Sequence, residues 1–552
     1  MKDKIRQPVF GKLRWSHASV PLALLAACAL PAHAFQIDTG NPDLSLRWDN
    51  TLKYSNAFRV GSQDDELLSN INQDDSNRNF DRGLVSNRLD LLSELEVMYR
   101  GTFGARISGA AWYDSLYNSS ADHDNPTSWN FPGTRHGHFQ SGVRDLHGRD
   151  AELLDYFVMG RFDLGGRNLT ARLGQHSLLW GESLFYGANG IAGGMQPVDA
   201  VKAQSVPNTQ FRELIRPVEQ VSAQFDLSPD VTLAAYYQFE WEGVRLPGAG
   251  SYFSVGDIVG DGSERILLGP QPFAPSVPVR YNKPKDSGQG GVSVRFRLPN
   301  GNAEYGLYAI RYHAKTGLSQ MRIGPGTPLP APVGPEQFEW AYAENIKAFG
   351  ASVSNTFGPV NLGFEVSTRR DSPLLSSNIS VLPGQIGDND KNAAFARGNT
   401  LHAQMSWIAT LPTNAVFRES SFVGEVAWNR MLSVTENREV LEPNGERDAW
   451  GFRVVFTPTY RQVLPQLDLS VPVGIGYSPR GRSLAVGNFG VDRGGDFNIG
   501  VRGTYQQDWG FGATYTNYFG SRGHFLTQQN QYSFDQPLAD RDFISLYVTR
   551  TF

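Results

Sequence analysis

The stretches that link the strand-like segments of this chain alternate between short and long, from the first segment to Phe552. The segments lie near residues 44–60, 87–101, 103–117, 151–164, 168–180, 219–227, 231–242, 288–300, 303–315, 343–358, 360–372, 398–411, 420–432, 448–462, 467–479, 495–508, 509–520 and 540–552. The long links cover about 61–86, 118–150, 181–218, 243–287, 316–342, 373–397, 433–447, 480–494 and 521–539. Transmembrane β-barrels have short periplasmic turns and long outer loops, and few soluble folds impose this spacing on a whole chain. The alternation predicts an all-β fold, an antiparallel transmembrane β-barrel of the bacterial outer membrane with about 18 strands.

Residues within several segments alternate between apolar and polar. In 231–241 the apolar set is Val231, Leu233, Ala235, Tyr237, Phe239 and Trp241, and the polar set includes Thr232, Gln238 and Glu240. A period of two residues places the two sets on opposite faces of a strand. In a membrane barrel the apolar face meets lipid and the polar face meets the lumen. A soluble sandwich alternates in the same way, so the choice between them depends on the spacing and on the chain ends.

The first residues predict an export signal. Basic residues precede a short apolar run over 20–30, and Ala32-His33-Ala34 fits a small-x-small cleavage site before Phe35. We therefore expect a signal peptide over 1–34 and a single outer-membrane β-barrel domain over 35–552. A competing interpretation is a lipobox over 25–28 that would lipidate Cys28. Cys28 is the only cysteine, so cleavage after Ala34 would leave a mature chain without disulfides or thiolate metal sites.

The last segment ends in a C-terminal Phe552 that closes an alternating strand. This arrangement resembles the recognition signal that outer-membrane proteins present to the barrel-assembly machinery, so Phe552 is the predicted assembly signal. Arg550 departs from the pattern, and we expect its long side chain to snorkel at the membrane edge. After residue 34 no apolar run is long enough for a membrane helix. The net charge of −5 argues against a nucleic-acid partner, and outer-membrane lipids and lipopolysaccharide are the expected surroundings.

The long link over 181–218 contains several glycines and both polar and apolar residues, and this composition predicts a loop folded into the lumen. A wide barrel has an open bore unless something narrows it. Aromatic residues would line an apolar path and charged residues, including Lys202 and Glu213, would pin the loop to the wall. The candidate lumen or constriction residues are Trp180, Glu182, Phe185, Tyr186, Asp199, Arg212 and Arg216. The alternative is that Trp-Gly-Glu-Ser over 180–183 is a structural corner, with Glu182 accepting backbone or arginine hydrogen bonds.

The same region carries a family resemblance. The motifs are Trp-Gly-Glu-Ser over 180–183, Pro-Val-Asp over 197–199 and Tyr-Gln-Phe-Glu-Trp over 237–241. Together they resemble the outer-membrane family catalogued as domain of unknown function 1302, although Gly174-Gln175-His176 stands where Gly-Arg-Gln is expected. The resemblance implies an outer-membrane barrel without a settled activity. It also implies a periplasmic partner of the domain of unknown function 1329 family, a resistance-nodulation-division permease, and a trans-envelope route for an apolar or amphipathic molecule.

Enzyme motifs are missing from the sequence. It has no Gly-x-Ser-x-Gly elbow, no His-Glu-x-x-His helix and no Walker loop. His136 and His138 lie near Asp122, His123 and Asp124, where a solvated loop is a better interpretation than a metal site. The acidic residues of 64–66 and 74–75 either form a hydrated loop or meet a divalent cation or cation-bridged lipopolysaccharide. We expect no enzyme activity, no cofactor and no assigned metal site.

The predicted function is an outer-membrane channel for small hydrophobic or amphipathic molecules, as one element of a trans-envelope transporter. The alternatives are a general or specific porin for polar solutes and a surface enzyme or adhesin carried on a barrel. Aromatic residues along the bore would favour the first. Basic and acidic residues at a constriction would favour the second, and a Ser-His-carboxylate cluster would favour the third.

Overall fold

A single sheet of 20 strands closes on itself in the computed structural model, which describes residues 35–299, 301–324, 333–414 and 416–552. The predicted signal peptide over 1–34 lies outside these residues. The wall strands are β2 (Leu44–Arg59), β3 (Gly83–Tyr99), β4 (Phe103–Asp114), β5 (Arg149–Asp163), β6 (Asn168–His176), β7 (Val218–Ser228), β8 (Val231–Gln238), β11 (Gln289–Arg297), β12 (Glu304–Tyr312), β15 (Ile346–Phe357), β16 (Val360–Pro373), β18 (Arg397–Leu411), β19 (Glu419–Glu436), β20 (Asp448–Leu464), β21 (Leu467–Ser470), β22 (Val473–Arg480), β23 (Gly494–Tyr505), β24 (Trp509–Phe519) and β25 (Phe543–Thr551).

Every wall strand pairs antiparallel with its neighbours along the chain, and β25 pairs with β2 to close the ring. The short β1 (Phe35–Ile37) adds to β2. Strands β21 and β22 occupy one place in the wall, separated at Pro472, which has no N–H to donate to the ladder. Leaving out β1 and counting β21 and β22 once, the barrel has 18 strands. The predicted fold class and strand number are therefore confirmed.

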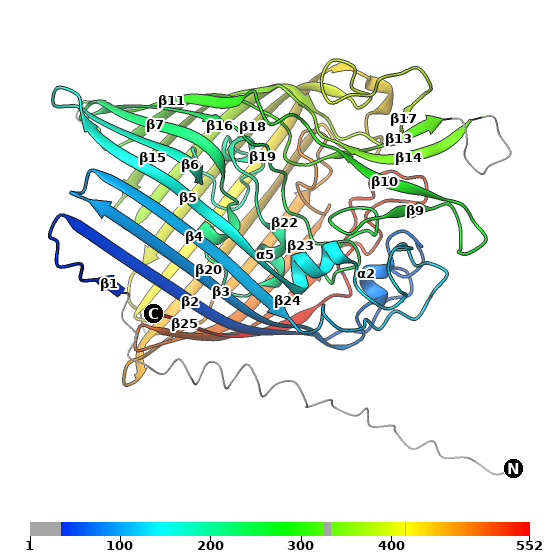
Figure 1. Ribbon diagram of the computed structural model, residues 1–552, viewed down its shortest axis with the longest axis horizontal. Coiled ribbons are helices and arrows are strands. Elements are labelled where there is room, and N and C mark those ends of the chain that lie inside the picture. The colour runs from blue at the N-terminus through cyan, green and yellow to red at the C-terminus, as the bar shows by residue number, and fades with distance from the viewer. Residues whose placement is uncertain (1–34, 300, 325–332, 415) are drawn as a thin grey trace, which may run out of the picture.

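The short turns and the C-terminus lie at one end of the barrel, which we call the turn end (Figure 1). The long links project at the opposite end, the loop end, where five strands form a second sheet. These strands are β9 (Arg265–Leu267), β10 (Ser276–Asn282), β13 (Leu318–Gly324), β14 (Gly334–Ala341) and β17 (Ile379–Val381). The sequence interpretation treated these segments as links. Two antiparallel pairs, β9 with β10 and β13 with β14, each form within one link, and parallel pairs of β10 with β14 and of β13 with β17 join the links into one sheet.

The alternation of side chains follows the prediction along most of β8. Tyr237 is 41% exposed on the outside, whereas Gln238 is 1% exposed and donates to the Met195 carbonyl inside the barrel. Beyond the strand the pattern breaks, because Trp241 is buried and its indole N–H donates to the Ala314 carbonyl at 3.2 Å. The expectation that Trp241 shares the lipid face was wrong, since β8 ends at Gln238 and the chain turns toward the loops.

The last strand joins the first through paired backbone bonds, in which Phe552 and Asn50 each donate an N–H to the other's carbonyl at 2.8 Å. Arg550 is 5% exposed and lies over the ring of Trp509 at 5.0 Å, so it packs against an aromatic ring where we expected it to extend to the membrane edge. In the part of the chain that the structure describes, no helix has the length and apolarity to cross a membrane.

Candidate functional site inside the barrel

The link between β6 and β7, residues 177–217, lies inside the barrel and is called the inner loop here. It contains three short helices, α4 (Ala192–Met195), α5 (Ala200–Ser205) and α6 (Phe211–Leu214). Its residues contact strands from different parts of the ring: β3 and β5 through ion pairs, and β16, β18 and β19 through hydrogen bonds. Only a segment that crosses the lumen reaches all of these strands.

Two buried carboxylates hold the backbone of the first half of the inner loop, residues 181–195. Glu425 of β19 accepts the N–H groups of Leu184 and Tyr186 at 3.0 and 2.9 Å, and that of Phe185 between them. Glu365 of β16 accepts the N–H groups of residues 182 and 191 at 3.0 and 2.7 Å. A carboxylate that accepts several N–H groups forms strong, charge-assisted hydrogen bonds. These two side chains therefore fix the path of the loop across the lumen.

Steric constraints explain why a glycine stands at position 181 of the Trp-Gly-Glu-Ser motif. Gly181 has a φ of +97°, and a Cβ there would run into the carboxylate of Glu365. Asn189 adds a second attachment, because its side-chain amide donates to the Ala403 and Trp428 carbonyls at 3.3 and 3.2 Å. The guanidinium of Arg369 donates to the carbonyls of residues 188 and 190 at 2.7 and 3.0 Å. The first half of the loop is thus fastened along most of its length.

Ion pairs hold the second half, residues 196–217. Arg245, which follows β8, bridges Asp199 of the loop at 3.0 Å and Glu152 of β5 at 2.6 Å. Asp199 also caps α5 by accepting the Lys202 N–H at 2.8 Å. The further pairs are Lys202 with Glu152 at 3.3 Å, Arg212 with Glu94 at 3.1 Å and Arg216 with Glu242 at 2.8 Å. Ion pairs with the wall thus form as expected at Lys202 and Arg212. Asp199 and Arg216 pair instead with the link that follows β8, and Glu213 accepts the Gln210 N–H at 3.1 Å within the loop.

An apolar cluster lies against the first half of the loop. Trp180 packs edge-on against Tyr236 and stacks on Tyr308, with ring centroids 5.1 and 6.1 Å apart. Ile191 and Met195 are fully buried in the same cluster, which continues toward the second sheet through the residues Ile310, Tyr312, Phe338, Trp340 and Phe395. Within the lumen, apolar residues therefore surround the first half of the loop and charged residues surround the second half, which we call the charged side.

A pocket of about 190 Å³ opens beside Trp180 and Glu182. Its apolar lining includes Leu178 and Leu179, and the guanidinium-bearing side chains at its wall are Arg172 and Arg295. Arg295 also approaches Glu304 at 3.6 Å. The pocket thus combines apolar surface with two guanidinium groups and two carboxylates, those of Glu182 and Glu304, and Arg172 is the one of these arginines without an ion pair among the described residues.

The predicted site residues do not form one group. Trp180 and Glu182 meet at the pocket, and Tyr186 packs against Phe489 with ring centroids 5.5 Å apart. Phe185 keeps 39% of its surface exposed, whereas Asp199, Arg212 and Arg216 lie on the charged side. No constriction is defined by these contacts, so the narrowing of the bore by the inner loop stays a prediction.

Glu182 lies at a corner of the chain, in agreement with the structural interpretation, but the hydrogen bonds expected from backbone or arginine donors to its side chain are not found among the described residues. Its N–H donates to Glu365 and its carbonyl accepts the Ser406 hydroxyl at 2.7 Å, so its backbone forms the corner. Its side chain accepts only a 3.4 Å hydrogen bond, from Ser352, among the residues described. The anchors that sequence reasoning missed, Glu365 and Glu425, are carboxylates in mid-strand on lumen-facing positions, and that placement was the available signal.

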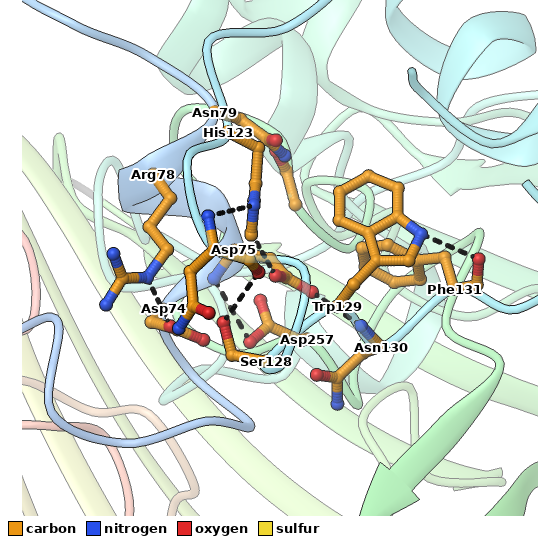
Figure 2. A network of polar contacts seen from close by, with 12 residues as sticks. Asp74, Asp75, Arg78, Asn79, His123, Ser128, Trp129, Asn130, Phe131 and Asp257 are labelled. Atoms are coloured by element: carbon orange, nitrogen blue, oxygen red, sulfur yellow. Dashed lines mark hydrogen bonds and ion pairs between the residues drawn. The ribbon is translucent and has the colours of Figure 1, made fainter. Parts of the chain in front are cut away.

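Acidic residues of the outer loops form a second group at the loop end. Asp74 and Asp75 of the link over 60–82 lie with Asp257, and one carboxylate oxygen of each lies within 4.8 Å of the others (Figure 2). Burial, and then the neighbouring carboxylates, raise the pKa of Asp75 and of Asp257 well above the usual range. Of the two acidic runs expected to be hydrated or to meet a cation, 74–75 is buried.

The remaining loop residues singled out in the sequence do not form a single group. Asp64 pairs with Arg522 and Asp65 is exposed. His123 Nδ1 contacts His136 Nε2 at 3.0 Å, and burial lowers the pKa of His123 to about 4. His138 takes no part in this contact, and Asp124 pairs with Arg78 at 2.8 Å.

Solved structures that align with this chain over most of its length are outer-membrane proteins with very low sequence identity to it. OccAB2 of Acinetobacter baumannii is 10% identical, with a TM-score of 0.43 over 94% of this chain and 99% of that chain. OccK11 (OpdR) of Pseudomonas aeruginosa is 9% identical, with a TM-score of 0.41 over 92% and 96%. OpdK of the same organism, solved with vanillate, is 11% identical, with a TM-score of 0.40 over 92% and 98%.

No curated protein matches the sequence. The model of one protein family matches residues 15–552, which is nearly the whole chain. Its description is "Protein of unknown function (DUF1302)". The resemblance seen in the motifs of the inner loop is therefore confirmed, and the chain belongs to the DUF1302 family.

Proposed function

We propose that the protein is an outer-membrane channel for small hydrophobic or amphipathic molecules. The observation that carries this proposal is the pocket beside Trp180, where apolar side chains and two arginines line one cavity in the lumen. Most binding sites for small molecules are largely apolar, whereas polar surface exceeds apolar surface in this pocket, which suits an amphipathic solute better than a purely apolar one. The closed barrel supplies the pathway across a membrane, and the inner loop supplies the surface that solutes meet.

The chemistry of the pocket favours an amphipathic anion. A carboxylate head would pair with the guanidinium of Arg172 or Arg295, because arginine binds carboxylates with two parallel hydrogen bonds. An apolar tail would lie against Trp180 and the leucines at 178 and 179. Glu182 on the same wall would repel a second negative charge, so monoanions are favoured over dianions.

Liposome swelling tests the proposal with purified full-length barrel. Octanoate should enter faster than glucose, and Arg172→Gln should lower octanoate entry several-fold while glucose entry stays unchanged. The matched control is Arg167→Gln, in an exposed turn at the turn end, which should leave both rates unchanged. Equal entry of the two solutes through the unaltered barrel would contradict the proposal.

The second candidate, a porin for polar solutes, is favoured by the charged side of the lumen. Glu94, Arg106, Glu152, Lys202, Arg212 and Arg216 line a smaller cavity of about 50 Å³ between the wall and the second half of the loop. A pathway on this side would carry hydrated solutes past charges of both signs. Faster entry of glucose than of octanoate, unaffected by Arg172→Gln, would support this candidate over the first.

The trans-envelope role belongs to the same proposal. A periplasmic protein of the domain of unknown function 1329 family and a resistance-nodulation-division permease would exchange solute with the channel at the turn end. Photo-crosslinking groups in the turns at 165–167 and 465–466 should capture a periplasmic protein, whereas the same group at Phe273 of the outer loops, 95% exposed, should not. Absence of any adduct at both turns would count against the partnership.

An enzyme carried on the barrel has less support. His176 contacts the Ser222 hydroxyl at 2.7 Å, but its other ring nitrogen contacts the Gly174 carbonyl at 2.9 Å. Both side chains are buried. A serine nucleophile needs a histidine base that a third group, usually a carboxylate, orients.

A further inference from the structure

Three outer loops converge on the acidic cluster of Asp74, Asp75 and Asp257. The link over 60–82 supplies the first two residues, the link over 239–288 supplies Asp257, and the link over 115–148 supplies Asn130. The N–H of Asn130 donates to Asp75 Oδ2 at 3.1 Å, and the N–H of Asp75 donates to Asp257 Oδ2 at 3.3 Å. Figure 2 shows these residues at one point beneath α2 (Asp75–Arg78).

When its three carboxylates are ionised, the negative charge of this cluster exceeds the positive charge of the side chains that contact it. Arg78 pairs with Asp74 at 2.5 Å, and His123 contacts Asp75 at 2.6 Å. In the described part of the chain, no ion pair reaches Asp257. Arg265 and Arg541 act on the cluster only over longer distances. Three carboxylates that are 0% exposed thus share one arginine in direct contact.

Oxygen atoms of the cluster also lack partners. Asp257 Oδ1 and Asn130 Oδ1 are fully buried and have no hydrogen-bond donor among the described residues. Asn130 uses its amide group for Asn72 Oδ1 at 2.8 Å and the Arg265 carbonyl at 3.1 Å, which leaves its oxygen as a spare acceptor. A buried acceptor without a partner costs about 1–3 kcal/mol, and more if it is charged. A cation bound among the three carboxylates would satisfy Asp257 Oδ1.

We propose that this cluster binds a calcium ion that fastens the three loops together. The available donors are carboxylate and amide oxygens, which suit hard divalent cations, and calcium accepts irregular sets of oxygen ligands at about 2.3–2.6 Å. His123 is turned away from metal binding, because its Nε2 is used by Asp75 and its Nδ1 contacts His136. Transition metals that prefer nitrogen therefore lack a ligand here.

The site lies where a fourth outer loop also attaches, so a bound ion would affect the stability of the loop end. Arg541, in the link between β24 and β25, donates to Ser76 Oγ at 2.9 Å and to the carbonyl of Ser254 at 2.9 Å. Ser76 follows Asp75 directly, and Ser254 lies three residues before Asp257. A fourth loop is therefore joined to the same point, and removing the ion should loosen the loop end while the wall stays closed.

Isothermal titration of the chelator-treated full-length barrel with calcium chloride tests the proposal. We expect one saturable site per barrel, with weaker binding of magnesium, which requires stricter octahedral geometry. Asp257→Asn should weaken calcium binding at least about tenfold, because it removes one charged ligand. The matched control is Asp65→Asn, an exposed acid in the same link as Asp74, which should bind like the unaltered protein.

Limited proteolysis of the same samples gives a second readout. Calcium should protect the links over 60–82 and 239–288 from cleavage in the unaltered barrel, and chelation should remove the protection. A heat-modifiable band on gels shows whether Asp257→Asn still forms a closed wall. The proposal is overturned if calcium produces no saturable binding to the unaltered barrel, or if Asp257→Asn and Asp65→Asn bind it equally.

Discussion

The two halves of the inner loop are held in the barrel by different interactions. In residues 181–195, backbone N–H groups donate to Glu365 and Glu425, whose side chains are 1% and 0% exposed. In residues 196–217, side chains form ion pairs with the wall, and the side chain of Arg212 stays 52% exposed. The first half lies against an apolar cluster and the second half against charged strands.

The two kinds of attachment predict different mobilities for the two halves of the inner loop. If the first half moved away from the wall, the buried carboxylates would lose their donors and the backbone N–H groups would lose their acceptors. Unpaired buried groups are costly, so the first half strongly favours a single conformation. Of the ion pairs in the second half, that of Arg212 with Glu94 is half-exposed, and such a pair contributes about 0–1 kcal/mol and weakens in salt, whereas the Arg245 bridge is largely buried and is screened less. We therefore expect the first half to be the fixed part of the pathway and the second half to be the part that moves.

Removing the whole inner loop should have the largest effect on the channel, and we expect to see it in the conductance. His176 pairs with Val218 in the ladder of β6 and β7, so a two-residue turn can replace residues 177–217 without moving the wall. Single-channel conductance in planar bilayers should rise several-fold, because the lumen loses the segment that fills it. The control is the same treatment of the exposed tip at 269–274 of the outer loops, which should leave conductance unchanged. Unaltered conductance after removal of the inner loop would place the constriction in another link.

Breaking the anchor of the first half should have the next largest effect. Glu425→Ala removes the acceptor of three consecutive N–H groups. Hydrogen bonds to a charged acceptor are worth about 1.5–3 kcal/mol each, so amide exchange of residues 183–186 should accelerate by more than about tenfold in hydrogen-exchange mass spectrometry. Glu419→Ala, on the same strand but at the exposed turn end, is the matched control. Exchange that stays slow in Glu425→Ala would show that side-chain packing holds this half.

Breaking the ion pairs should loosen only the second half, and by less. Arg245→Gln removes the bridge between Asp199 and Glu152, whose side chains are 2% and 19% exposed. Exchange of residues 198–205 should increase a few-fold in Arg245→Gln. Raising the salt to 1 M, where the Debye length is about 3 Å, should accelerate exchange of residues 210–214 in the unaltered protein, because the Arg212–Glu94 pair that holds them is half-exposed. Exchange in 183–191 should respond to neither change. An equal response of both halves to salt would remove the distinction between them.

The wall could be predicted from the sequence because its information is local. Alternation and turn residues located all 18 wall positions, and the prediction failed where a neighbouring loop takes over, as at Trp241. The second sheet was missed because β9 and β17 are only three residues long and because the parallel pairs that join its hairpins into one sheet connect different links, which local spacing cannot indicate. Pairing of β10 with β14, for example, joins segments that are separated by two wall strands.

The anchors of the inner loop could be predicted only in part. Charged residues such as Glu365 and Glu425 stand out on the lumen side of their strands. What they bind cannot be read from spacing, since Glu425 accepts N–H groups about 240 residues away in the chain. The ion pairs of the second half were easier to expect, because loop residues such as Asp199 and Arg216 carry charges that a lumen must neutralise. Which wall residue meets each of them depends on the register of the whole ring.

The smallest effect is expected at Glu182, on the border between the pocket and the fixed half. Its backbone is held by Glu365 and Ser406, whereas its side chain accepts one 3.4 Å hydrogen bond from Ser352. Glu182→Ala should therefore leave folded yield and the exchange of 183–191 unchanged, and should raise conductance slightly by widening the pocket. Glu182→Gln, which keeps the size and the acceptor, should match the unaltered protein in conductance but admit dianions more readily, because the repelling charge is gone. A large fall in folded yield for Glu182→Ala would show that the side chain helps to hold the corner, so that the fixed half depends on more than its backbone contacts.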